Sequence, residues 1–321
     1  MKILMTGASS FTGFWFAKTL AERGHQLTLT FTKDADNYSG LRQERIHQLL
    51  QIPGVVILWN YRFGSDEFIS LLNQNFDVIC HHGAFVEDYK SLQFDTLRAV
   101  EQNTFQCDKL ILAAKEKGVR KIILSGSVFE ANEGKGSLPL VAFSPYGLSK
   151  TFSWELFRFW SWKYNMPLTK FVIPNPFGPY EEPRFCNYLI QSWFKGQVPS
   201  VKTPDYTRDN IHVDLLAGAY ASITEKESKD IEVINPSGYI STQKEFCLKF
   251  AKEIGDRIGL STDVIFEIQK EFEEPISRVN TVSAQSYYHE WNEQKAWDQL
   301  ALYYRKLLNI ESDNRIRSHK V

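Results

Sequence analysis

A tyrosine and a lysine stand four residues apart in the segment Tyr146-Gly-Leu-Ser-Lys150. On a helix this spacing places both side chains on one face, one turn apart. A lysine cation beside a phenol favours the phenolate and lowers the pKa of the tyrosine, so Tyr146 could move a proton near neutral pH. An isolated pair of this kind is usually a surface pair. This one lies downstream of Ser125 and of a glycine-containing loop, which makes it a candidate for catalysis.

That loop, at residues 7–13, joins the first predicted strand to the first predicted helix. Gly7 can form the tight turn, Gly13 lets helix and strand pack closely, and the helix N-terminus presents free N–H groups to a pyrophosphate. Small residues are also common in ordinary connections, but the position at the first crossover favours a dinucleotide site. The residues predicted to line it are Gly7, Ser9, Ser10, Phe11, Thr12 and Gly13.

The end of the second predicted strand bears on the choice of dinucleotide. Sites that take NAD usually end this strand in Asp or Glu, which accepts hydrogen bonds from the ribose 2′-OH. Here Phe31 holds that place and is followed by Thr32 and Lys33. A hydroxyl and a cation suit a 2′-phosphate better. We therefore favour NADP(H), with NAD(H) as the alternative if Lys33 is only a solvated loop lysine.

Strand-like and helix-like segments alternate through most of the chain. Predicted strands occupy residues 2–6, 26–32, 55–59, 76–81, 121–124, 168–173 and 231–234, and predicted helices occupy residues 14–23, 66–73, 96–117, 146–164 and 213–224. Such alternation implies a parallel sheet covered by helices on both faces. The predicted fold is an α/β, doubly wound parallel-sheet Rossmann fold with a smaller C-terminal α/β substrate lobe.

The composition of the sequence changes after residue 173, where prolines become frequent. Prolines then cluster at 174, 176, 179, 183, 199 and 204, which predicts irregular chain outside the sheet. We assign residues 1–173 and about 207–235 to the dinucleotide-binding domain, and about 174–206 and 236–321 to the substrate lobe. A further helix is expected at residues 291–308, and residues 311–321 read as a frayed tail.

Composition narrows the functional classes. With 37 Lys and Arg against 38 Asp and Glu, the net charge is −1, which offers no general field for nucleic acid. No run of apolar residues reaches about 18, the length that a membrane-spanning helix needs. The apolar run at the N-terminus is too short for the hydrophobic region of a signal peptide. The four cysteines form no C-x-x-C pair, which fits a reducing compartment. We predict a cytoplasmic protein with neither nucleic-acid nor membrane partners.

Several short motifs occur together in one order. They are TGASSFTG at 6–13, HHGA at 81–84, NTFQ from Asn103, SGSVFE at 125–130, YGLSK at 146–150, PNPFGP at 174–179 and RDNIHVD at 208–214. In this set the chain resembles the extended short-chain dehydrogenases/reductases of the nucleotide-sugar epimerase, dehydratase and reductase group. The resemblance covers about residues 1–260, and the shared order makes the set specific.

The resemblance implies a role for each candidate residue. Tyr146 would be the acid/base on the substrate oxygen, and Lys150 would hold the nicotinamide ribose and tune Tyr146. Counting back three residues from Val128 identifies Ser125 as the residue that hydrogen-bonds the same oxygen, with Ser127 as the fallback. The further cofactor contacts implied are Gly83, Ala84, Asn103 and Pro174, and the substrate contacts implied are Ser127, Asn175, Arg184 and Arg208.

The two arginines are not equally strong candidates for binding the substrate. Arg208 is suited to a diphosphate as a bidentate donor. Arg184 is a weaker candidate of the same kind, because an exposed surface arginine is its more ordinary identity. The substrate itself is expected to be a nucleotide sugar.

Departures from the family pattern bear on the reaction. Ser10 stands where the middle glycine of the loop is expected, so its side chain could alter the approach to the pyrophosphate. Sugar 4,6-dehydratases carry an Asp-Glu pair directly after the catalytic residue, whereas this chain has Gly126 and Ser127. Dehydration therefore ranks third. Reduction of a 4-keto sugar nucleotide ranks first, because Phe31 replaces the acid that holds NAD, and 4-epimerisation with retained NAD ranks second.

Two expectations concern the molecule beyond its chemistry. The aromatic helix at residues 146–164 belongs, in the family, to a dimeric four-helix bundle, so a homodimer is implied. A second functional class remains as the alternative, a non-catalytic NADP(H)-binding sensor or scaffold. The intact set of Ser125, Tyr146 and Lys150 argues against it. His81 and His82 are adjacent on a strand and would point to opposite faces, so no metal site is expected.

Overall fold

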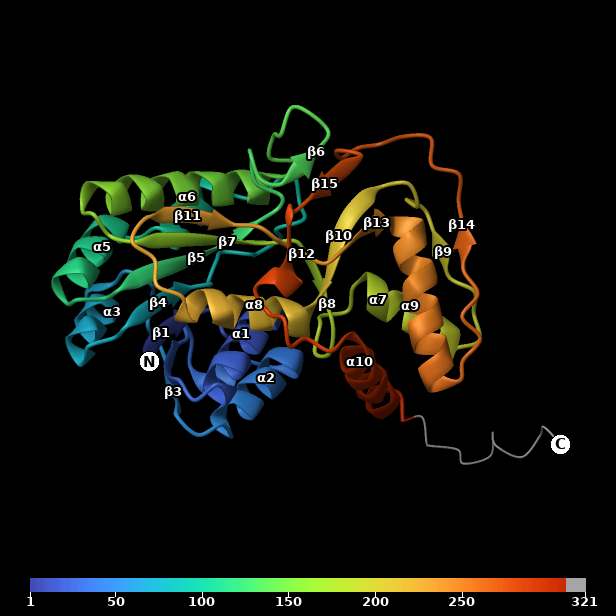
Figure 1. Ribbon diagram of the computed structural model, residues 1–321, viewed down its shortest axis with the longest axis horizontal. Helices are drawn as coiled ribbons and strands as arrows, with labels where there is room; N and C mark the ends of the chain where they lie inside the picture. Colours follow the sequence, from blue (N-terminus) through green and yellow to red (C-terminus); the bar gives the residue numbers. More distant parts are fainter. Residues whose placement is uncertain (310–321) are drawn as a thin grey trace.

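A parallel sheet of seven strands forms the centre of the larger part of the molecule (Figure 1). The structure, a computed structural model, describes residues 1–309. From one edge to the other, the strands are β3 (Val55–Leu58), β2 (Gln26–Thr30), β1 (Lys2–Thr6), β4 (Val78–His81), β5 (Lys121–Ser127), β7 (Leu168–Ile173) and β11 (Ile231–Ile234). The direction of winding reverses between β1 and β4, and ligands bind beyond the carboxyl ends of strands at such a point. The predicted Rossmann fold is confirmed.

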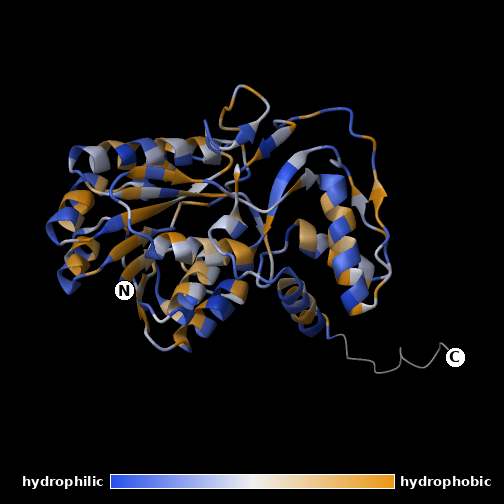
Figure 2. Cartoon of the chain, viewed as in Figure 1, coloured by the Kyte–Doolittle hydropathy of each residue, from blue (hydrophilic) through white to orange (hydrophobic). Residues whose placement is uncertain are grey.

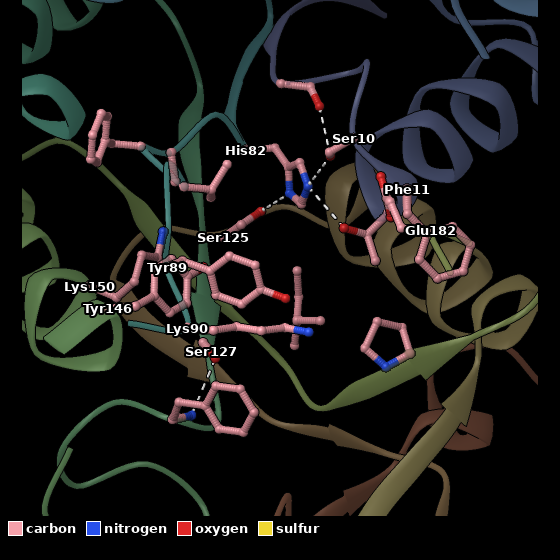
Figure 3. Close-up of a pocket in the computed structure, with 18 of the residues that line it drawn as sticks. Ser10, Phe11, His82, Tyr89, Lys90, Ser125, Ser127, Tyr146, Lys150 and Glu182 are labelled. Atoms are coloured by element: carbon pink, nitrogen blue, oxygen red, sulfur yellow. Dashed lines mark hydrogen bonds between the residues drawn. The ribbon is translucent and has the colours of Figure 1, made fainter. Parts of the chain in front are cut away.

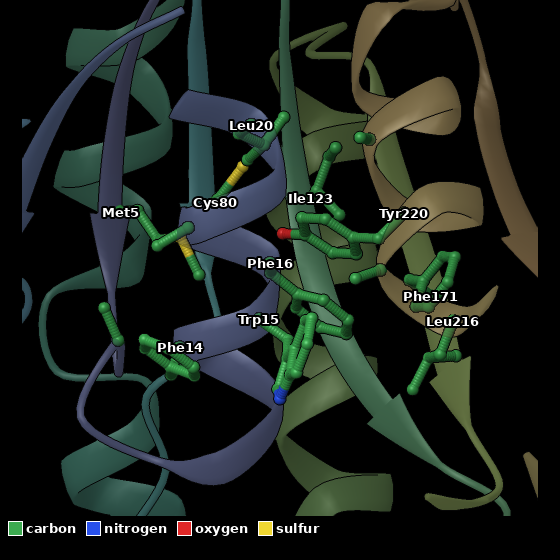
Figure 4. Close-up of a cluster of buried hydrophobic side chains, with 14 of the residues drawn as sticks. Met5, Phe14, Trp15, Phe16, Leu20, Cys80, Ile123, Phe171, Leu216 and Tyr220 are labelled. Carbon is green, nitrogen blue, oxygen red and sulfur yellow. The ribbon is translucent and has the colours of Figure 1, made fainter. Parts of the chain in front are cut away.

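Helices cover both faces of this sheet (Figure 1). One face packs against α1 (Phe11–Glu22), α2 (Gly40–Leu50) and α8 (Val213–Glu225), and the other against α3 (Asp66–Ser70), α5 (Cys107–Glu116) and α6 (Pro145–Lys163), with α4 (Thr96–Asn103) packed on α6. In Figure 2 hydrophobic residues gather on the central strands and on the helix faces turned toward them. Figure 4 shows the first of these cores, where Phe16 of α1 stacks on Tyr220 of α8 with ring centroids 4.0 Å apart.

Local signals explain where the helices of the site begin. Ser10 accepts a hydrogen bond from the N–H of Gly13 and so caps α1, and Ser144 caps α6 in the same way through Gly147. Pro145 occupies the first turn of α6, where its missing N–H removes no helical bond. Serine caps of this kind are worth about 1 kcal/mol each. They place the first turns of α1 and α6 at the edge of the sheet where the strands end.

The helix predicted at residues 96–117 is in fact two helices, α4 and α5. The chain turns at Gln106, whose φ is +46°, in the left-handed region. The carbonyl of Asn103 accepts a hydrogen bond from His81 Nε2 at 3.0 Å, and the N–H of Cys107 donates instead to Thr104 O. The tertiary contact with His81 therefore takes the acceptor that a continuous helix would have used. Helix α2 was not predicted at all.

A smaller lobe follows the sheet in the chain. Its larger sheet contains β13 (Tyr239–Thr242), β10 (Thr207–His212), β15 (Ser277–Val279) and β6 (Lys135–Gly136) in that order, with β8 (Asn175–Phe177) paired to β10. Two small pairs join β12 (Pro236–Ser237) to β16 (Val282–Ser283) and β14 (Ile265–Phe266) to β9 (Ser200–Val201). Helices α7 (Phe185–Phe194), α9 (Gln243–Ile258) and α10 (Glu293–Leu307) enclose a core around Phe177 and Trp297. Single 3-10 turns lie at Ala35–Asn37, Leu71–Gln74 and Ala284–Ser286.

Two expectations for this part need correction. The proline-rich stretch after residue 173 is not uniformly irregular, because α7 lies within it, between Pro183 and Pro199. Strand β10 pairs within the smaller sheet rather than the seven-stranded one, although the chain returns to the large sheet with β11. The domain boundaries otherwise stay a prediction. The tail predicted at residues 311–321 lies outside the described residues.

Among residues 1–309, no helix combines the length and the apolar character needed to cross a membrane.

Candidate functional site

A cleft of about 2010 Å³ opens beyond the carboxyl ends of the central strands and extends to the smaller lobe. Sites for a single small molecule usually occupy about 300–1,000 Å³, so this cleft has room for two ligands. Its lining includes every predicted site residue except Gly13, which lies beneath the loop. Residues more than a hundred positions apart in the sequence are thus brought to one cavity, although their roles stay predictions.

The loop at residues 7–13 closes the cleft on the side of α1. Gly7 has a φ of +78°, and a Cβ there would lie 2.6 Å from the N atom of Gly83. Ser10 turns its hydroxyl back onto the loop, donating to Gly7 O at 2.9 Å and accepting from the N–H of Gly13 at 3.2 Å. Phe11 and Thr12 open α1 and line the cleft, where the first N–H groups of a helix lack partners within it. The loop therefore fits the phosphates of a dinucleotide, and Ser10 serves as the helix cap.

The far end of the cleft is lined by Thr32 and Lys33 beyond β2 and by Arg42 from α2. Phe31 is buried beneath them and packs against Tyr38 and Trp59. The nearby carboxylate of Asp34 is turned away and accepts a hydrogen bond from Asn60. Sequence reasoning missed Arg42 because it missed α2.

The predicted catalytic residues lie between these ends, near the end of strand β5 and on the first turns of helix α6 (Figure 3). Ser125 is buried near the end of β5, and Tyr146 and Lys150 occupy successive turns of α6. Tyr89, from the loop after β4, packs its ring edge-on to Tyr146 with centroids 5.5 Å apart. The hydroxyl of Ser125 lies 2.7 Å from Nδ1 of His82. The arrangement brings a phenol, an ammonium group and a hydroxyl to one place.

The electrostatics of Tyr146 differ from the expectation. Burial raises the pKa of Tyr146, the charge of Glu130 and the neighbouring Tyr89 raise it further, and Arg184 opposes them. Burial also lowers the pKa of Lys150 to about 8, with Glu130 acting in the other direction. The expectation that Lys150 would depress the pKa of Tyr146 is therefore wrong, because burial raises this pKa and Lys150 is not among the charges that act on it. At neutral pH the phenol holds its proton.

A buried ion cluster lies beneath the serine segment. Glu130 is fully buried and forms an ion pair with Lys170 of β7, which also contacts Glu133 at 2.5 Å. Oε1 of Glu130 accepts the N–H of Ser127 at 2.7 Å, and a Cβ on Gly126 would lie 2.7 Å from Cε of Lys170. The cluster therefore fixes the backbone that carries Ser125. Sequence reasoning missed it because its members come from different elements.

The two candidate arginines are placed differently. The guanidinium of Arg208 is nearly buried, donates to the carbonyls of Thr207, Pro275 and Ile276, and pairs with Glu274 at 2.9 Å. Its donors are thus largely used by the protein. Arg184 is exposed just before α7 and lines the cleft, and its guanidinium makes no hydrogen bond or ion pair with residues 1–309. Arg184 is the better placed of the two for an anionic ligand.

The remaining predicted contacts form two groups. Asn103 is buried and accepts the N–H of Phe85 at 2.8 Å, and Gly83 donates to Thr6 Oγ1 at 2.9 Å, so both hold the loop after β4 in place. Asn175 of β8 and Asn210 of β10 are register partners, and both line the cleft. The Nδ2 atom of each is buried with no partner among the described residues. Pro174, Ala84 and Ser127 line the cleft between these groups.

The two adjacent histidines have separate partners. His81 bonds to Thr6 Oγ1 at 2.9 Å and to Asn103 O, whereas His82 reaches Ser125 and the loop at α1. Within residues 1–309, no group of three His, Cys, Asp or Glu side chains is arranged to hold a metal ion. All four cysteines are buried and free.

The profile of the NAD dependent epimerase/dehydratase family matches residues 3–235. The chain belongs to this family. It is therefore an enzyme of the extended short-chain dehydrogenase/reductase type, as the motifs predicted. The comparison with curated proteins found no sequence that matches this chain.

Solved structures share its fold. A variant of UDP-glucuronic acid 4-epimerase from Bacillus cereus, in complex with UDP-4-deoxy-4-fluoro-glucuronic acid and NAD, is 21% identical with a TM-score of 0.76, over 96% of this chain and 100% of that one. UDP-N-acetylglucosamine 4-epimerase from Methanobrevibacter ruminantium is 17% identical with a TM-score of 0.74, over 95% and 98% of the two chains. UDP-glucose 4-epimerase from Thermotoga maritima is 17% identical with a TM-score of 0.71, over 96% and 100%. At these identities the likeness shows a common fold.

Proposed function

We propose that this enzyme reduces a 4-keto sugar nucleotide with NADPH, using Tyr146 as the acid. The observation that carries the proposal is the cofactor end of the cleft, where Thr32, Lys33 and Arg42 replace the carboxylate that usually holds NAD. The size of the cleft supports it, since a dinucleotide and a nucleotide sugar must bind together.

The residues present fit such a reaction. The loop at residues 7–13 and the first turn of α1 would hold the pyrophosphate, and Lys150 the nicotinamide ribose. NADPH, when bound, supplies the hydride. Tyr146 would donate a proton to the substrate oxygen, with Ser125 hydrogen-bonded to the same atom. Arg184, Asn175 and Arg208 are the proposed substrate contacts, and only Arg184 keeps its charged donors unused by residues 1–309.

The preference for NADP(H) rests on the far end of the cleft. A 2′-phosphate needs donors and positive charge, and Thr32, Lys33 and Arg42 supply both. No carboxylate from residues 30–42 lines the cleft there, whereas a 2′-OH is usually held by one.

A 4-epimerase that retains NAD is the second candidate. It is favoured by the solved structures of similar fold, whose names describe UDP-sugar 4-epimerases, several of them in complex with NAD. An epimerase removes a proton from a hydroxyl and later returns one to the same oxygen, so Tyr146 would serve either reaction and the retained cofactor distinguishes them.

We also propose that the enzyme is a cytoplasmic homodimer. The outer face of α6 exposes Phe152, Phe159 and Trp162, the last of them 67% exposed, and Leu97 of α4 is 77% exposed. Large apolar patches of this kind mark interaction sites. Light scattering coupled to size-exclusion chromatography should give twice the chain mass of 37.2 kDa. A monomer at micromolar concentration would contradict the dimer.

The first test of the function is the cofactor. Protein purified without added nucleotide is denatured, and the released dinucleotide is identified by mass spectrometry. The dissociation constants of NADPH and NADH are then measured by fluorescence titration. We expect NADPH to bind at least tenfold more tightly than NADH. In an activity assay, we then expect NADPH to be oxidised when 4-keto sugar nucleotides are added. Tightly retained NAD would instead support the epimerase.

A matched pair of variants sharpens the cofactor test. Arg42→Ala removes a cation from the cleft, and Arg120→Ala removes one from the surface outside it. We expect Arg42→Ala to weaken NADPH binding about tenfold, or about 1.4 kcal/mol, with little effect on NADH. Equal effects on both dinucleotides would contradict a 2′-phosphate site. A protein that binds NADPH but reduces none of these substrates would favour the sensor or scaffold.

A further inference from the structure

The imidazole of His82 lies between the phosphate loop and the predicted catalytic serine (Figure 3). Its Nδ1 is 2.7 Å from the hydroxyl oxygen of Ser125. On the other side of the ring, Nε2 is 3.0 Å from Thr12 Oγ1 and 3.1 Å from Ser10 Oγ. One ring therefore contacts both the loop that would hold the pyrophosphate and the hydroxyl that would contact the substrate.

Packing holds this ring in place. The ring of Phe16 meets it edge-on with centroids 5.2 Å apart. A Cβ on Gly13 would lie 2.8 Å from Cδ2 of His82, so the absence of a side chain at position 13 makes room for the imidazole. The histidine is thus a fixed part of the site.

Hydrogen-bond accounting assigns the tautomer. The single hydrogen of the Ser10 hydroxyl is donated to Gly7 O at 2.9 Å, so Ser10 Oγ can only accept from its other neighbours. It accepts the N–H of Gly13, and its contact with Nε2 of His82 is satisfied when that nitrogen carries the hydrogen, which Thr12 Oγ1 at 3.0 Å can also accept. Burial, with a smaller repulsion from Lys150, lowers the pKa of His82 to about 3, so the ring is neutral and carries only that hydrogen. Nδ1 must then accept, and the donor is the hydroxyl of Ser125.

We propose that His82 is a positioning residue that holds the hydroxyl hydrogen of Ser125 on its Nδ1 and ties Ser125 to the phosphate loop. In this orientation the lone pairs of Ser125 face the cleft and accept a hydrogen bond from the hydroxyl that forms when Tyr146 protonates the substrate carbonyl. Ser125 therefore contacts the reacting oxygen as an acceptor, once that oxygen carries a hydrogen. This inference rests on the proposed role of Ser125 in the reaction.

Two amide substitutions separate the two sides of the ring. The side-chain amide of asparagine reaches the position of Nδ1, and that of glutamine reaches the position of Nε2. We expect His82→Asn to raise the dissociation constant of the dinucleotide and to lower kcat less than His82→Gln does, because only the contact with Ser125 survives. We expect His82→Gln to lower kcat about tenfold with dinucleotide binding unchanged, a loss typical of one hydrogen bond. His82→Phe should show both effects.

A spectroscopic measurement tests the tautomer without any substrate. In protein labelled with 15N-histidine, the ring shifts should show a neutral imidazole protonated at Nε2. Ser125→Ala should move the resonance of Nδ1 and leave that of Nε2 nearly unchanged. Protonation at Nδ1 would overturn the proposal even in an active enzyme.

The remaining outcomes also decide. A His82→Gln variant with the kcat of the parent protein would overturn the role in orienting Ser125. Equal losses of kcat in all three variants, together with a lower Tm, would overturn it in favour of simple packing. If no sugar nucleotide is turned over by the parent protein, the proposed function fails, and the 15N shifts still confirm or refute the tautomer.

Discussion

The two ends of the cleft are built from different kinds of groups. At the phosphate loop, the contacts are made by backbone N–H groups, hydroxyls and a neutral histidine, with Ser10 and His82 satisfying one another. At the substrate end, charged residues dominate, because Glu181, Arg184 and Arg208 line the cleft and the ion pair of Glu130 with Lys170 is buried beneath it. The first end can bind an anion without changing its own charge state. The second end depends on which carboxyl groups are ionised, so pH and substitution should affect it more strongly.

The largest effect that would test this comparison is expected at Tyr146. Tyr146→Phe removes the acid and should lower kcat by about 10²–10⁴-fold, while the dinucleotide still binds, because the phosphate loop is untouched. Steady-state kinetics and fluorescence titration measure the two quantities. Tyr89→Phe removes a phenol from the same cleft and should change kcat less than about tenfold. Equal losses in the two variants would contradict the assignment of Tyr146.

The next effect concerns the buried ion cluster. Lys170→Met leaves Glu130 and Glu133 buried without their cation and should lower the free energy of unfolding by about 3–5 kcal/mol. Urea denaturation followed by fluorescence measures it. Lys163→Met, at an exposed position on the last turn of α6, is the control and should change stability by less than about 0.5 kcal/mol. A stable Lys170→Met protein would show that the cluster does not hold the serine segment.

Glu181 allows a prediction of pH dependence. Burial raises the pKa of this carboxyl, which lines the cleft, from 4.5 to about 8. The folded protein favours the neutral form, so the stabilisation is complete below the unfolded pKa and is lost as the pH rises through about 8. Glu181→Gln should therefore match the parent near pH 5 and exceed its stability at pH 9 by about 2–4 kcal/mol. Denaturation curves at both values are the measurement, and a constant difference would contradict the raised pKa.

The smallest effect separates the two arginines of the substrate end. Arg184→Ala should raise KM for the sugar nucleotide about tenfold, or about 1.4 kcal/mol, with unchanged stability, because its guanidinium makes no hydrogen bond or ion pair with residues 1–309. Arg208→Ala should lower the free energy of unfolding by about 1–3 kcal/mol, since several carbonyl oxygens and Glu274 lose their donor. The reverse pattern would exchange their roles.

The sequence predicted the regular half of the molecule well, because its signals are local. Alternating apolar runs and the loop after residue 6 were sufficient for the parallel sheet and the dinucleotide end. Helix α7 was missed because Pro183 and Pro199 on either side of it dominate the composition there. The break between α4 and α5 was missed because its cause is a hydrogen bond from His81, far away in the sequence.

By itself, the sequence determined the family, the fold and the set of side chains available for chemistry, since motif order and periodicity are written along the chain. Only the tertiary structure decided what those side chains can do. It placed Tyr146, half-buried, beside Glu130 and Tyr89 so that its pKa rises rather than falls, occupied the donors of Arg208, and joined Ser125 to His82. Each of these three features depends on how much water a group loses and on partners that are distant in sequence. Neither the lost hydration nor these partners can be read from the sequence before the chain is folded.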